Sequence, residues 1–371
     1  MTLASEIMRT RVGTVMLTED CTENIEILEG MGIVLDLAGH RLANAKNDYT
    51  IKNRGDLTII DSVGGGSVYN NAPLKGCLLN DGPGNVVIRD GVGFSLNSRP
   101  NNQSWYCIVN LGGLMQIDDA IVTGISDFTT AVRNGYYNEE PDGHSPVMVI
   151  NGGTFSSQKI PVKNDSFGKM IINGGEFTSP NECVLTWNDC TINSGTFTTT
   201  ANYTVFTGAY TDPGCGGDFV INGGTFDGTK GIIRDLTPEY APDIAIPPTL
   251  EVRGGSFNMA VDSKFLAPGV EMSSAGGRSE AVKFGWDVTS FGSTEMQHMR
   301  RMIIRAPRMQ YVAGGIDLPN IGFTPVTVMG ASAEGGIMAY YDESTRKLRL
   351  YRNGAEASGT VTDLSVILLG V

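Results

Sequence analysis

The sequence has few of the residues that usually carry metal or acid–base chemistry. Its three histidines, His40, His144 and His298, are isolated from one another. Its six cysteines form no CxxC pair and no cysteine–histidine group with the spacing of a zinc site. We therefore expect buried free thiols, no metal and no cofactor. No segment before residue 290 keeps the 3.6-residue period of an amphipathic helix, which argues against a helix-rich fold.

Long apolar runs and basic residues are also scarce. No apolar run approaches the roughly 18 residues of a membrane helix, and the N-terminus lacks the apolar core of a signal peptide. The net charge is −13, and residues 293–371 hold eight Arg or Lys against seven acids, so the rest carries −14. Because nucleic-acid phosphates require a basic surface, we expect no nucleic-acid partner. From the lack of long apolar segments we expect no membrane partner and synthesis in the cytoplasm.

Glycine is abundant, and a glycine-containing phrase recurs. The chain has 48 glycines without a collagen period. Five copies of the phrase follow at intervals of 22, 20, 29 and 31 residues: INGGTF (150–155), INGGEF (172–177), INSGTF (192–197), INGGTF (221–226) and VRGGSF (252–257). Each copy indicates a strand, a turn with positive φ, and a second strand. One copy alone could bury little, so we expect the copies to stack as coils of a parallel β-helix.

Stacking in register would place like residues above one another. The predicted core ladder has an aliphatic, an aromatic and an amide column: Ile150, Ile172, Ile192, Ile221 and Val252; Phe155, Phe177, Phe197, Phe226 and Phe257; and Asn151, Asn173, Asn193 and Asn222. The asparagine amides are expected to hydrogen-bond along the stack and to tolerate the backbone of the turn. Arg253 interrupts this column, so the amide ladder should end there.

Weaker copies precede the clear ones and define the predicted domains. Ile59, Ile88 and Ile117 are spaced by 29 residues, and residues 33–42 fit a first coil. About nine coils at ~4.8 Å each give a rod about 40 Å long. We assign residues 1–30 to an N-terminal cap or attachment segment, 31–275 to the β-helix, 276–302 to a capping segment and linker, and 303–371 to a C-terminal β module.

The C-terminal module has a different pattern. Its short alternating strands are separated by Gly, Asp and Pro turns, which is typical of an antiparallel sandwich or jelly roll. The fold class is therefore all-β throughout. The one basic cluster, Arg300, Arg301, Arg305 and Arg308, is short and fits an exposed connecting segment or an interface contact.

No catalytic constellation emerges from the acids. Asp118 and Asp119 are adjacent and would face opposite sides of a strand, and Asp165 and Asp189 lie near bends and fit turn formers. A glycosidase needs two carboxylates about 5–9.5 Å apart, and a lyase usually needs a calcium site and a basic residue. Neither pattern is present, so we expect no enzymatic activity.

Insertions between the repeats are the better functional candidates. Residues 133–146, 198–218 and 231–249 exceed the basic coil of 20–22 residues and are expected to leave the stack as loops. The candidate contact residues are five tyrosines and two acids: Tyr136, Tyr137, Tyr203, Tyr210, Tyr240, Glu139 and Asp142. Flat aromatic faces beside carboxylates suit a glycan, and the same composition also suits a subunit interface or a solvated loop.

Two regions resemble known protein families. The tracts ENIEILEGMGIVLDLAGHRL (23–42), IKNRGDLTIIDSVGGGSV (51–68) and SFNMAVDSKFLAPGVEM (256–272) resemble β-helical stalk and adhesin-like repeats of bacterial surface proteins and of their bacteriophages. This resemblance implies a right-handed coil. IMAYYDESTRKLRLY (337–351) is similar to C-terminal modules of phage head-decoration proteins, head fibres and tail appendages.

The resemblance implies a non-enzymatic structural protein of a phage virion. Its expected partners are other capsid or tail proteins and further copies of itself, as a trimer, with a host-surface polysaccharide as a possible ligand. Residues 302–319 are the expected trimer contact. One alternative is a tailspike-type polysaccharide depolymerase, which would release oligosaccharides. A second alternative is a bacterial surface adhesin, against which the missing export signal counts.

The predicted columns can be tested by truncating one aromatic residue. Phe197→Ala lies in the middle of the column and should lower the free energy of unfolding by about 3–5 kcal/mol, as large-to-small core changes do. Tyr137→Ala lies in an insertion and should leave the unfolding midpoint nearly unchanged. Chemical denaturation measures both variants, and equal losses would show that the inside and outside positions are assigned wrongly.

Overall fold

The computed structural model describes most of the chain as two compact units. The described residues are 2–96, 106–124, 130–137, 143–275, 277–283, 287–293, 300–311, 316–317, 325–332, 338–342, 345, 347–352, 355–357 and 359–370. The first unit comprises Met1–Phe265 and Ser274–Glu280, and the second comprises Leu266–Ser273 and Ala281–Val371. Each unit is described by itself below.

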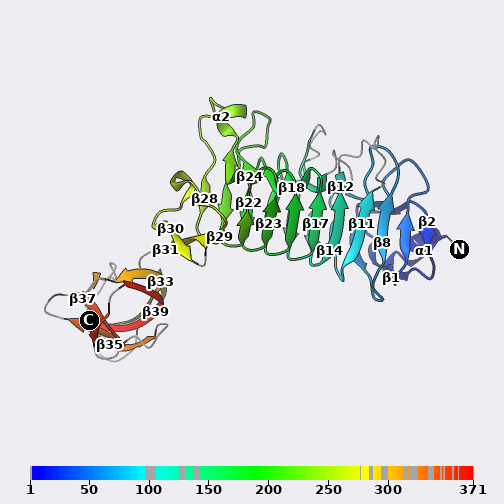
Figure 1. The fold of residues 1–371 in the computed structure, drawn as a ribbon. Coiled ribbons are helices and arrows are strands. Elements are labelled where there is room, and N and C mark those ends of the chain that lie inside the picture. The colour runs from blue at the N-terminus through cyan, green and yellow to red at the C-terminus, as the bar shows by residue number, and fades with distance from the viewer. Residues whose placement is uncertain are drawn as a thin grey trace. The chain divides into compact units, whose positions relative to one another are not determined.

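The first unit is a parallel β-helix, as the sequence predicts (Figure 1). Each strand pairs in parallel with the strand three places later in the chain, so β1 pairs with β4 and β4 with β7. The chain therefore forms three parallel sheets. Within the described ranges, the strands make nine complete coils and the first two strands of a tenth. The handedness implied by the family resemblance stays a prediction.

The strands of sheet A begin each coil. They are β1 (Val12–Met16), β4 (Gly32–Asp36), β7 (Asp56–Ile60), β10 (Asn85–Ile88), β13 (Leu114–Ile117), β16 (Val147–Ile150), β19 (Lys169–Ile172), β22 (Cys190–Ile192), β25 (Phe219–Ile221) and β28 (Leu250–Val252). Sheet B follows with β2 (Cys21–Thr22), β5 (Arg41–Ala43), β8 (Ser67–Asn70), β11 (Val92–Leu96), β14 (Ala120–Gly124), β17 (Thr154–Ser157), β20 (Glu176–Ser179), β23 (Thr196–Thr199), β26 (Thr225–Asp227) and β29 (Gly255–Phe257).

Sheet C closes each coil. Its strands are β3 (Ile25–Ile27), β6 (Ile51–Asn53), β9 (Leu78–Asn80), β12 (Tyr106–Asn110), β15 (Thr130–Asn134), β18 (Ile160–Asn164), β21 (Val184–Thr186), β24 (Tyr203–Thr207) and β27 (Gly231–Asp235). The extra residues of the insertions were expected to leave the stack as loops, but β24 and β27 lie within two of these segments and β15 includes the first two residues of the other. These segments are strands because their alternate apolar residues, such as Val132, Val205 and Ile233, stack inside the coil.

The interior of the β-helix consists of columns of like residues. Ile150, Ile172 and Ile192 are direct partners in neighbouring strands of sheet A, and Ile221 and Val252 continue the column. In sheet B, the ring of Phe177 lies 5.0 Å from that of Phe155 and 4.7 Å from that of Phe197, with interplanar angles of 8° and 5°. Phe226 and Phe257 extend this stack. All ten side chains are fully buried.

An exposed amide ladder runs along the turn between sheets A and B. Asn173 Nδ2 donates to Asn151 Oδ1 at 2.8 Å, and Asn193 and Asn222 repeat this contact in the following coils. Below Asn151 the ladder continues to the carboxylate of Asp118, at 2.7 Å. At the other end, Arg253 turns to Glu251 in an ion pair of 2.6 Å.

A second amide ladder is buried at the ends of the sheet C strands. Each Nδ2 donates to Oδ1 of the next coil at 2.7–2.9 Å, through Asn53, Asn80, Asn110, Asn134 and Asn164. The second hydrogen of each amide bonds to a main-chain carbonyl, for example Gly84 O for Asn80. Asn164 ends the row at the hydroxyl of Thr186, at 3.2 Å. The ladder therefore satisfies polar groups within the interior, where leaving them unpaired is costly.

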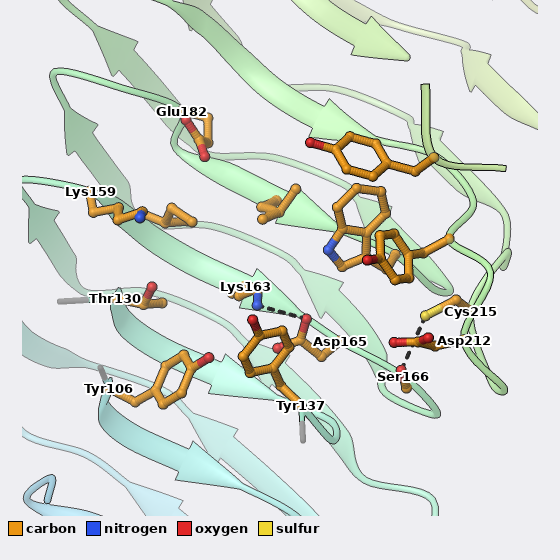
Figure 2. A pocket seen from close by; sticks show the side chains of 15 residues that line it. Tyr106, Thr130, Tyr137, Lys159, Lys163, Asp165, Ser166, Glu182, Asp212 and Cys215 are labelled. Carbon is orange, nitrogen blue, oxygen red and sulfur yellow. Dashed lines mark hydrogen bonds and ion pairs between the residues drawn. The ribbon is translucent and has the colours of Figure 1, made fainter. Parts of the chain in front are cut away.

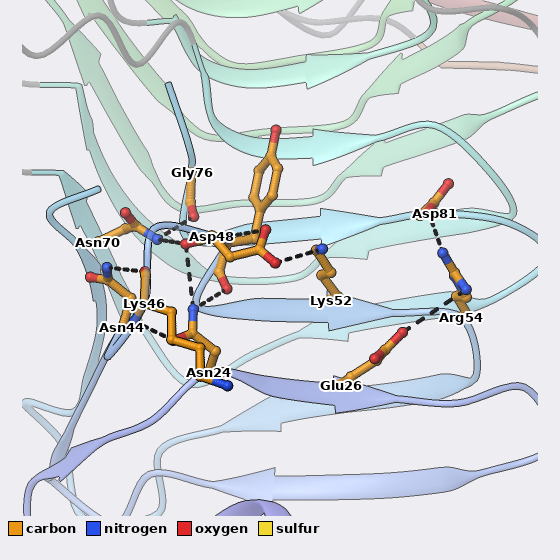
Figure 3. Close-up of polar contacts among 11 residues, drawn as sticks. Asn24, Glu26, Asn44, Lys46, Asp48, Lys52, Arg54, Asn70, Gly76 and Asp81 are labelled. Atoms are coloured by element: carbon orange, nitrogen blue, oxygen red, sulfur yellow. Dashed lines mark hydrogen bonds and ion pairs between the residues drawn. The ribbon is translucent and has the colours of Figure 1, made fainter. Parts of the chain in front are cut away.

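Polar side chains also fix the turns of the first coils (Figure 3). Asn24 Oδ1 accepts from the backbone N–H of Ala45 and Lys46, and its Nδ2 donates to Tyr49 O. In the third coil, Asn70 Nδ2 donates to Asp48 O of the second coil. These side chains bind backbone groups that the turns between sheets B and C leave without strand partners.

The N-terminal boundary of the β-helix lies earlier than the sequence suggested. Residues 1–30 were assigned to a cap, but β1, β2 and β3 form a complete first coil, and Val12–Met16 pairs with Gly32–Asp36 in register. Helix α1 (Leu3–Thr10) precedes this coil and buries Leu3 and Ile7. The first coil was not predicted from the sequence because it lacks the glycine-pair turn of the later repeats.

Two further strands follow the partial tenth coil in the chain. Strands β30 (Val270–Ala275) and β31 (Arg278–Lys283) follow the 3-10 helix η1 (Ser263–Phe265), and the boundary between the units crosses both strands. Within the first unit, the guanidinium of Arg278 pairs with Asp227 at 2.7 Å and donates to Ser256 Oγ at 2.8 Å. These contacts hold Arg278 against β26 and β29, the last strands of the coils in sheet B.

The second unit contains antiparallel strands in its described part. One sheet has the order β32 (Asp287–Ser293), β33 (Arg300–Tyr311), β39 (Gly359–Gly370) and β35 (Pro325–Ser332). The other contains β34 (Ile316–Asp317), β37 (Lys347–Arg352), β36 (Met338–Asp342) and β38 (Ala355–Glu356). Leu348, Leu350, Leu364 and Val366 are buried, while a sandwich or jelly-roll arrangement stays a prediction.

The basic cluster of this unit is not a connecting segment. Arg300, Arg301, Arg305 and Arg308 lie in β33, an inner strand that pairs with β32 and β39. The strand was not predicted because its arginines do not alternate with apolar residues, and its pairing with residues 359–370 depends on distant sequence. The region from 302 to 319 expected to hold the trimer contact includes most of this strand.

The two amide ladders should differ in their contribution to stability. Asn110→Ala removes an amide that is fully buried and leaves its partners Asn80 and Asn134 with unpaired groups. The free energy of unfolding should fall by about 1–3 kcal/mol. Asn173→Ala in the exposed ladder is the matched control and should cost less, because water replaces the lost bonds. Urea denaturation measures both, and a larger loss for the exposed residue would contradict the assignment.

Candidate functional site

A cavity of about 390 Å³ lies on the outer side of sheet C (Figure 2). Its lining residues come from six successive coils, on the sheet C strands and in the segments beside them: Tyr106, Thr130, Tyr137, Lys159, Ile160, Lys163, Asp165, Ser166, Glu182, Leu185, Trp187, Tyr210, Asp212, Cys215 and Tyr240. Sheet C provides a regular base because its strands pair in register, with Val162 opposite both Val132 and Val184. The outward side chains between these buried valines form the floor of the cavity.

Three aromatic rings form one wall of the cavity, here called the aromatic wall. Trp187 follows β21, Tyr210 follows β24, and Tyr240 ends helix α2 (Thr237–Tyr240). The ring centroids of Trp187 lie 5.4 Å from those of Tyr210 and Tyr240, and the two tyrosines are 5.5 Å apart. At these distances the rings pack against one another, so a ligand would contact their outer faces.

Hydrogen bonds hold the two tyrosine-bearing segments together. Thr237 Oγ1 accepts from the N–H of Ala209, and the N–H of Leu236 donates to Thr207 O. The start of α2 is thereby anchored to the loop after β24, near which it appears in Figure 1. The aromatic wall is therefore positioned by backbone contacts as well as by ring packing.

Lysine and aspartate form a buried ion pair on the cavity floor. Lys163 Nζ lies 2.9 Å from Asp165 Oδ1, and their side chains are 10% and 2% exposed. The same ammonium lies 4.1 Å from the centre of the Tyr137 ring. Figure 2 shows the ion pair next to the Tyr137 ring. The carboxylate and the ring both attract the Lys163 ammonium, which offsets the cost of burying this cation.

Glu182 and Lys159 occupy another part of the cavity. Glu182 precedes β21 and is only 9% exposed, while Lys159 precedes β18 and is half-buried. Burial raises the pKa of the Glu182 carboxyl, and its own backbone N–H and the charges of Lys159, Arg234 and Lys163 oppose this shift. Burial is the dominant cause because removing a carboxylate from water disfavours its charged form.

A cysteine and a serine meet at the end of the cavity near Asp212. Cys215 Sγ lies 3.1 Å from Ser166 Oγ. Burial raises the pKa of the Cys215 thiol, with the carboxylates of Asp165 and Asp212 acting in the same direction against the Ser166 hydrogen bond and Lys163. The thiol is therefore held in its protonated form and is a poor nucleophile.

The predicted contact tyrosines have different surroundings. Tyr137, Tyr210 and Tyr240 line the cavity. Tyr203 lies on β24 and lines a separate cavity of about 390 Å³ together with Arg234 and Lys264. Glu139 and Asp142 fall outside the described residues.

The prediction for Tyr136 is wrong. This residue was expected to lie in an exposed loop, but it is only 4% exposed and packs edge-on against Phe167, with a centroid distance of 6.2 Å. A bridge from Tyr136 to Ser166 holds its backbone against the next coil. Tyr136 is thus a packing residue, and only its neighbour Tyr137 faces the cavity.

Several lining residues were not identified from the sequence. Trp187, Glu182, Lys159 and Lys163 were not considered, and Asp165 was interpreted as a turn former. These residues could have been found as the outward neighbours of the buried valines in sheet C. That step first requires the sheet C strand of each coil to be recognised. Once this strand is placed, Lys163 and Leu185 are direct neighbours on the outer face.

The carboxylates are poorly arranged for glycoside cleavage. Val162 and Val184 are register partners, Asp165 follows the first by three residues and Glu182 precedes the second by two. Five residue positions correspond to roughly 16 Å along a strand. Hydrolysis needs about 5–9.5 Å between the two carboxylates. Glu182 and Asp165 therefore lack the spacing of an acid and nucleophile pair.

Other site types are not found in the described part of the chain. No group of three or more His, Cys, Asp or Glu side chains suited to a metal ion occurs among these residues. No helix within the described ranges is long and apolar enough to cross a membrane. Comparisons with known proteins find no matching family model, no matching curated protein and no matching solved structure.

The raised pKa of Glu182 predicts a pH-dependent effect on stability. A carboxyl whose pKa is higher in the folded state than the unfolded value of about 4.3 contributes stability below that value, and this contribution is lost as the pH rises through the folded pKa. Glu182→Gln should therefore unfold at a higher urea concentration than wild type at pH 7, and the difference should shrink toward pH 4. Glu176→Gln, at an exposed position, is the control and should show a smaller change between the two pH values.

Proposed function

We propose that the protein is a non-enzymatic structural protein that binds a surface polysaccharide in the cavity on sheet C. The observation that carries this proposal is the aromatic wall of Trp187, Tyr210 and Tyr240 in the same cavity as Glu182 and Lys159. The apolar face of a sugar ring packs on aromatic rings, while its hydroxyls need polar groups nearby. A cavity lined by six coils suits an extended chain of sugars.

The proposed setting is a bacteriophage virion. The resemblance of residues 23–42, 51–68, 256–272 and 337–351 to phage proteins supports a capsid-decoration, head-fibre or tail-fibre subunit, assembled as a trimer with other virion proteins. A β-helix suits this role, because each coil is held to the next by strand pairing and by stacked side chains such as Phe177 and Phe197. The helix would hold the polysaccharide site on a stiff support.

A polysaccharide depolymerase is the second candidate. One observation favours it: Glu182 is a buried carboxyl with a raised pKa in the cavity, which is the property of a general acid. The separation from Asp165 counts against a hydrolase. In this case incubation would shorten the polysaccharide, and Glu182→Gln would stop the shortening.

Binding to purified polysaccharides tests the proposal. We expect the full chain to bind at least one polymer of a panel of bacterial capsular and O-antigen polysaccharides. Trp187→Ala should weaken this binding about tenfold or more, because it removes the ring that contacts both tyrosines of the aromatic wall. Affinity electrophoresis measures the binding, and gel filtration of the polymer shows whether its length changes.

Tyr69→Ala is the matched control for this experiment. Tyr69 lies on β8 of sheet B, half-buried, with the guanidinium of Arg41 over its ring at 3.9 Å, and it is outside the cavity. Its loss should leave binding unchanged. Equal losses in the two variants, or no binding by wild type to any polymer, would refute the assigned site. Release of oligosaccharides would favour the depolymerase instead.

A further inference from the structure

The carboxylate of one cavity residue, Glu182, is held only by its own backbone N–H within the described part of the chain. Glu182 is 9% exposed and lines the cavity. No other residue in the described ranges donates a hydrogen bond to it or forms an ion pair with it. A buried carboxylate requires hydrogen-bond donors, and here an occupant of the cavity is the group placed to supply them.

The cations around Glu182 are mostly engaged elsewhere. Lys163 forms its ion pair with Asp165, and Arg234 Nη2 lies 2.9 Å from Glu239 Oε2. Lys159 forms no ion pair with any residue that the structure describes. The cavity therefore offers a ligand the Glu182 carboxylate as an acceptor and the Lys159 ammonium as a donor (Figure 2).

We infer that this cavity selects a neutral, hydroxyl-bearing polysaccharide and rejects sugars that carry a carboxylate. The inference rests on the proposed function and names the ligand class. Hydroxyl groups can donate to the Glu182 carboxylate and accept from the Lys159 ammonium. A uronic acid would place a second carboxylate near Glu182 in a medium of low dielectric, where like charges repel strongly.

The charge of the surroundings points in the same direction. The cavity is lined by three acids, Asp165, Glu182 and Asp212, and by two lysines. The whole chain carries −13. An acidic polymer is thus opposed by the local charge and by the field of the molecule. A neutral polymer experiences neither effect.

Protonation of Glu182 should weaken the selection. The titratable and charged groups that act on this carboxyl are Lys159 before β18, Lys163 on β18 and Arg234 on β27. As the pH falls through the pKa of Glu182, the side chain loses its charge and one acceptor. Neutral polymers should then bind less tightly, and the repulsion of acidic polymers should disappear.

The test compares neutral and acidic polymers on wild type and Glu182→Gln. Dextran, mannan, galactan and β-glucan are the neutral probes, and alginate, polygalacturonate and hyaluronate are the acidic ones. Any bound neutral polymer is also measured after oxidation of its primary hydroxyls to carboxylates, which keeps the rest of the chain constant where such hydroxyls are present. We expect oxidation to lower wild-type affinity at least tenfold, and Glu182→Gln to remove most of this difference and most of the pH dependence.

Glu176→Gln is the control, because Glu176 lies on β20 of sheet B outside this cavity. It should retain the wild-type preference. Acidic polymers that bind wild type as tightly as neutral ones, or a preference that Glu182→Gln leaves intact, would overturn the inference while the polysaccharide site stands. Binding that Trp187→Ala does not weaken would instead refute the site itself, and the inference with it.

Discussion

In-register pairing between successive coils is the constraint on which the rest of the first unit depends. Each strand finds its partner one coil later, so a side chain at a given position meets the corresponding side chain of the next coil. The Phe155–Phe257 stack and the Ile150–Val252 column follow from this repetition. Because inward positions must match from coil to coil, variation is confined to outward positions and to loops. The cavity is built from both of these.

The division between strands and loops also organises the candidate site. Lys163 and Leu185 lie on paired strands, so strand geometry fixes their spacing. Trp187, Tyr210 and Tyr240 lie just beyond strand ends or on α2, where the chain is free to differ between coils. The polar floor thus depends on the repeat, while the aromatic wall depends on departures from it. The loops could therefore change the aromatic wall while the β-helix stays the same.

The repeated phrase was sufficient to predict the sheets that it encodes. Isoleucine, the glycine pair and phenylalanine mark the turn between sheets A and B, and this pattern gives the parallel stack and about the right number of coils. Sheet C was missed because segments such as Ile160–Asn164 have no glycine turn and carry charged residues on their outer face. Buried asparagines at the ends of these strands also resemble turn residues, although they form a ladder.

The same omission limited the prediction of the site. Tyr210 and Tyr240 were identified by composition alone, but Tyr136 was misplaced because its insertion contains a strand and a bridge to the next coil. Glu182 could not be recognised from sequence, since its properties come from burial beneath segments that are distant along the chain. The pairing of β33 with β39 is likewise set by residues about sixty positions apart.

Asp118 fixes the orientation of the side-chain amides in the exposed ladder. Hydrogen bonds from Asn151 and Gln116 and the charge of Arg89 outweigh burial and lower the pKa of this carboxyl, so it only accepts hydrogen bonds. Asn151 must therefore present its nitrogen to Asp118, and each later amide follows the same orientation. In the buried ladder the donors point the opposite way, from Asn53 toward Asn164. The two rows of side-chain dipoles are thus antiparallel, and their axial fields oppose each other along the stack.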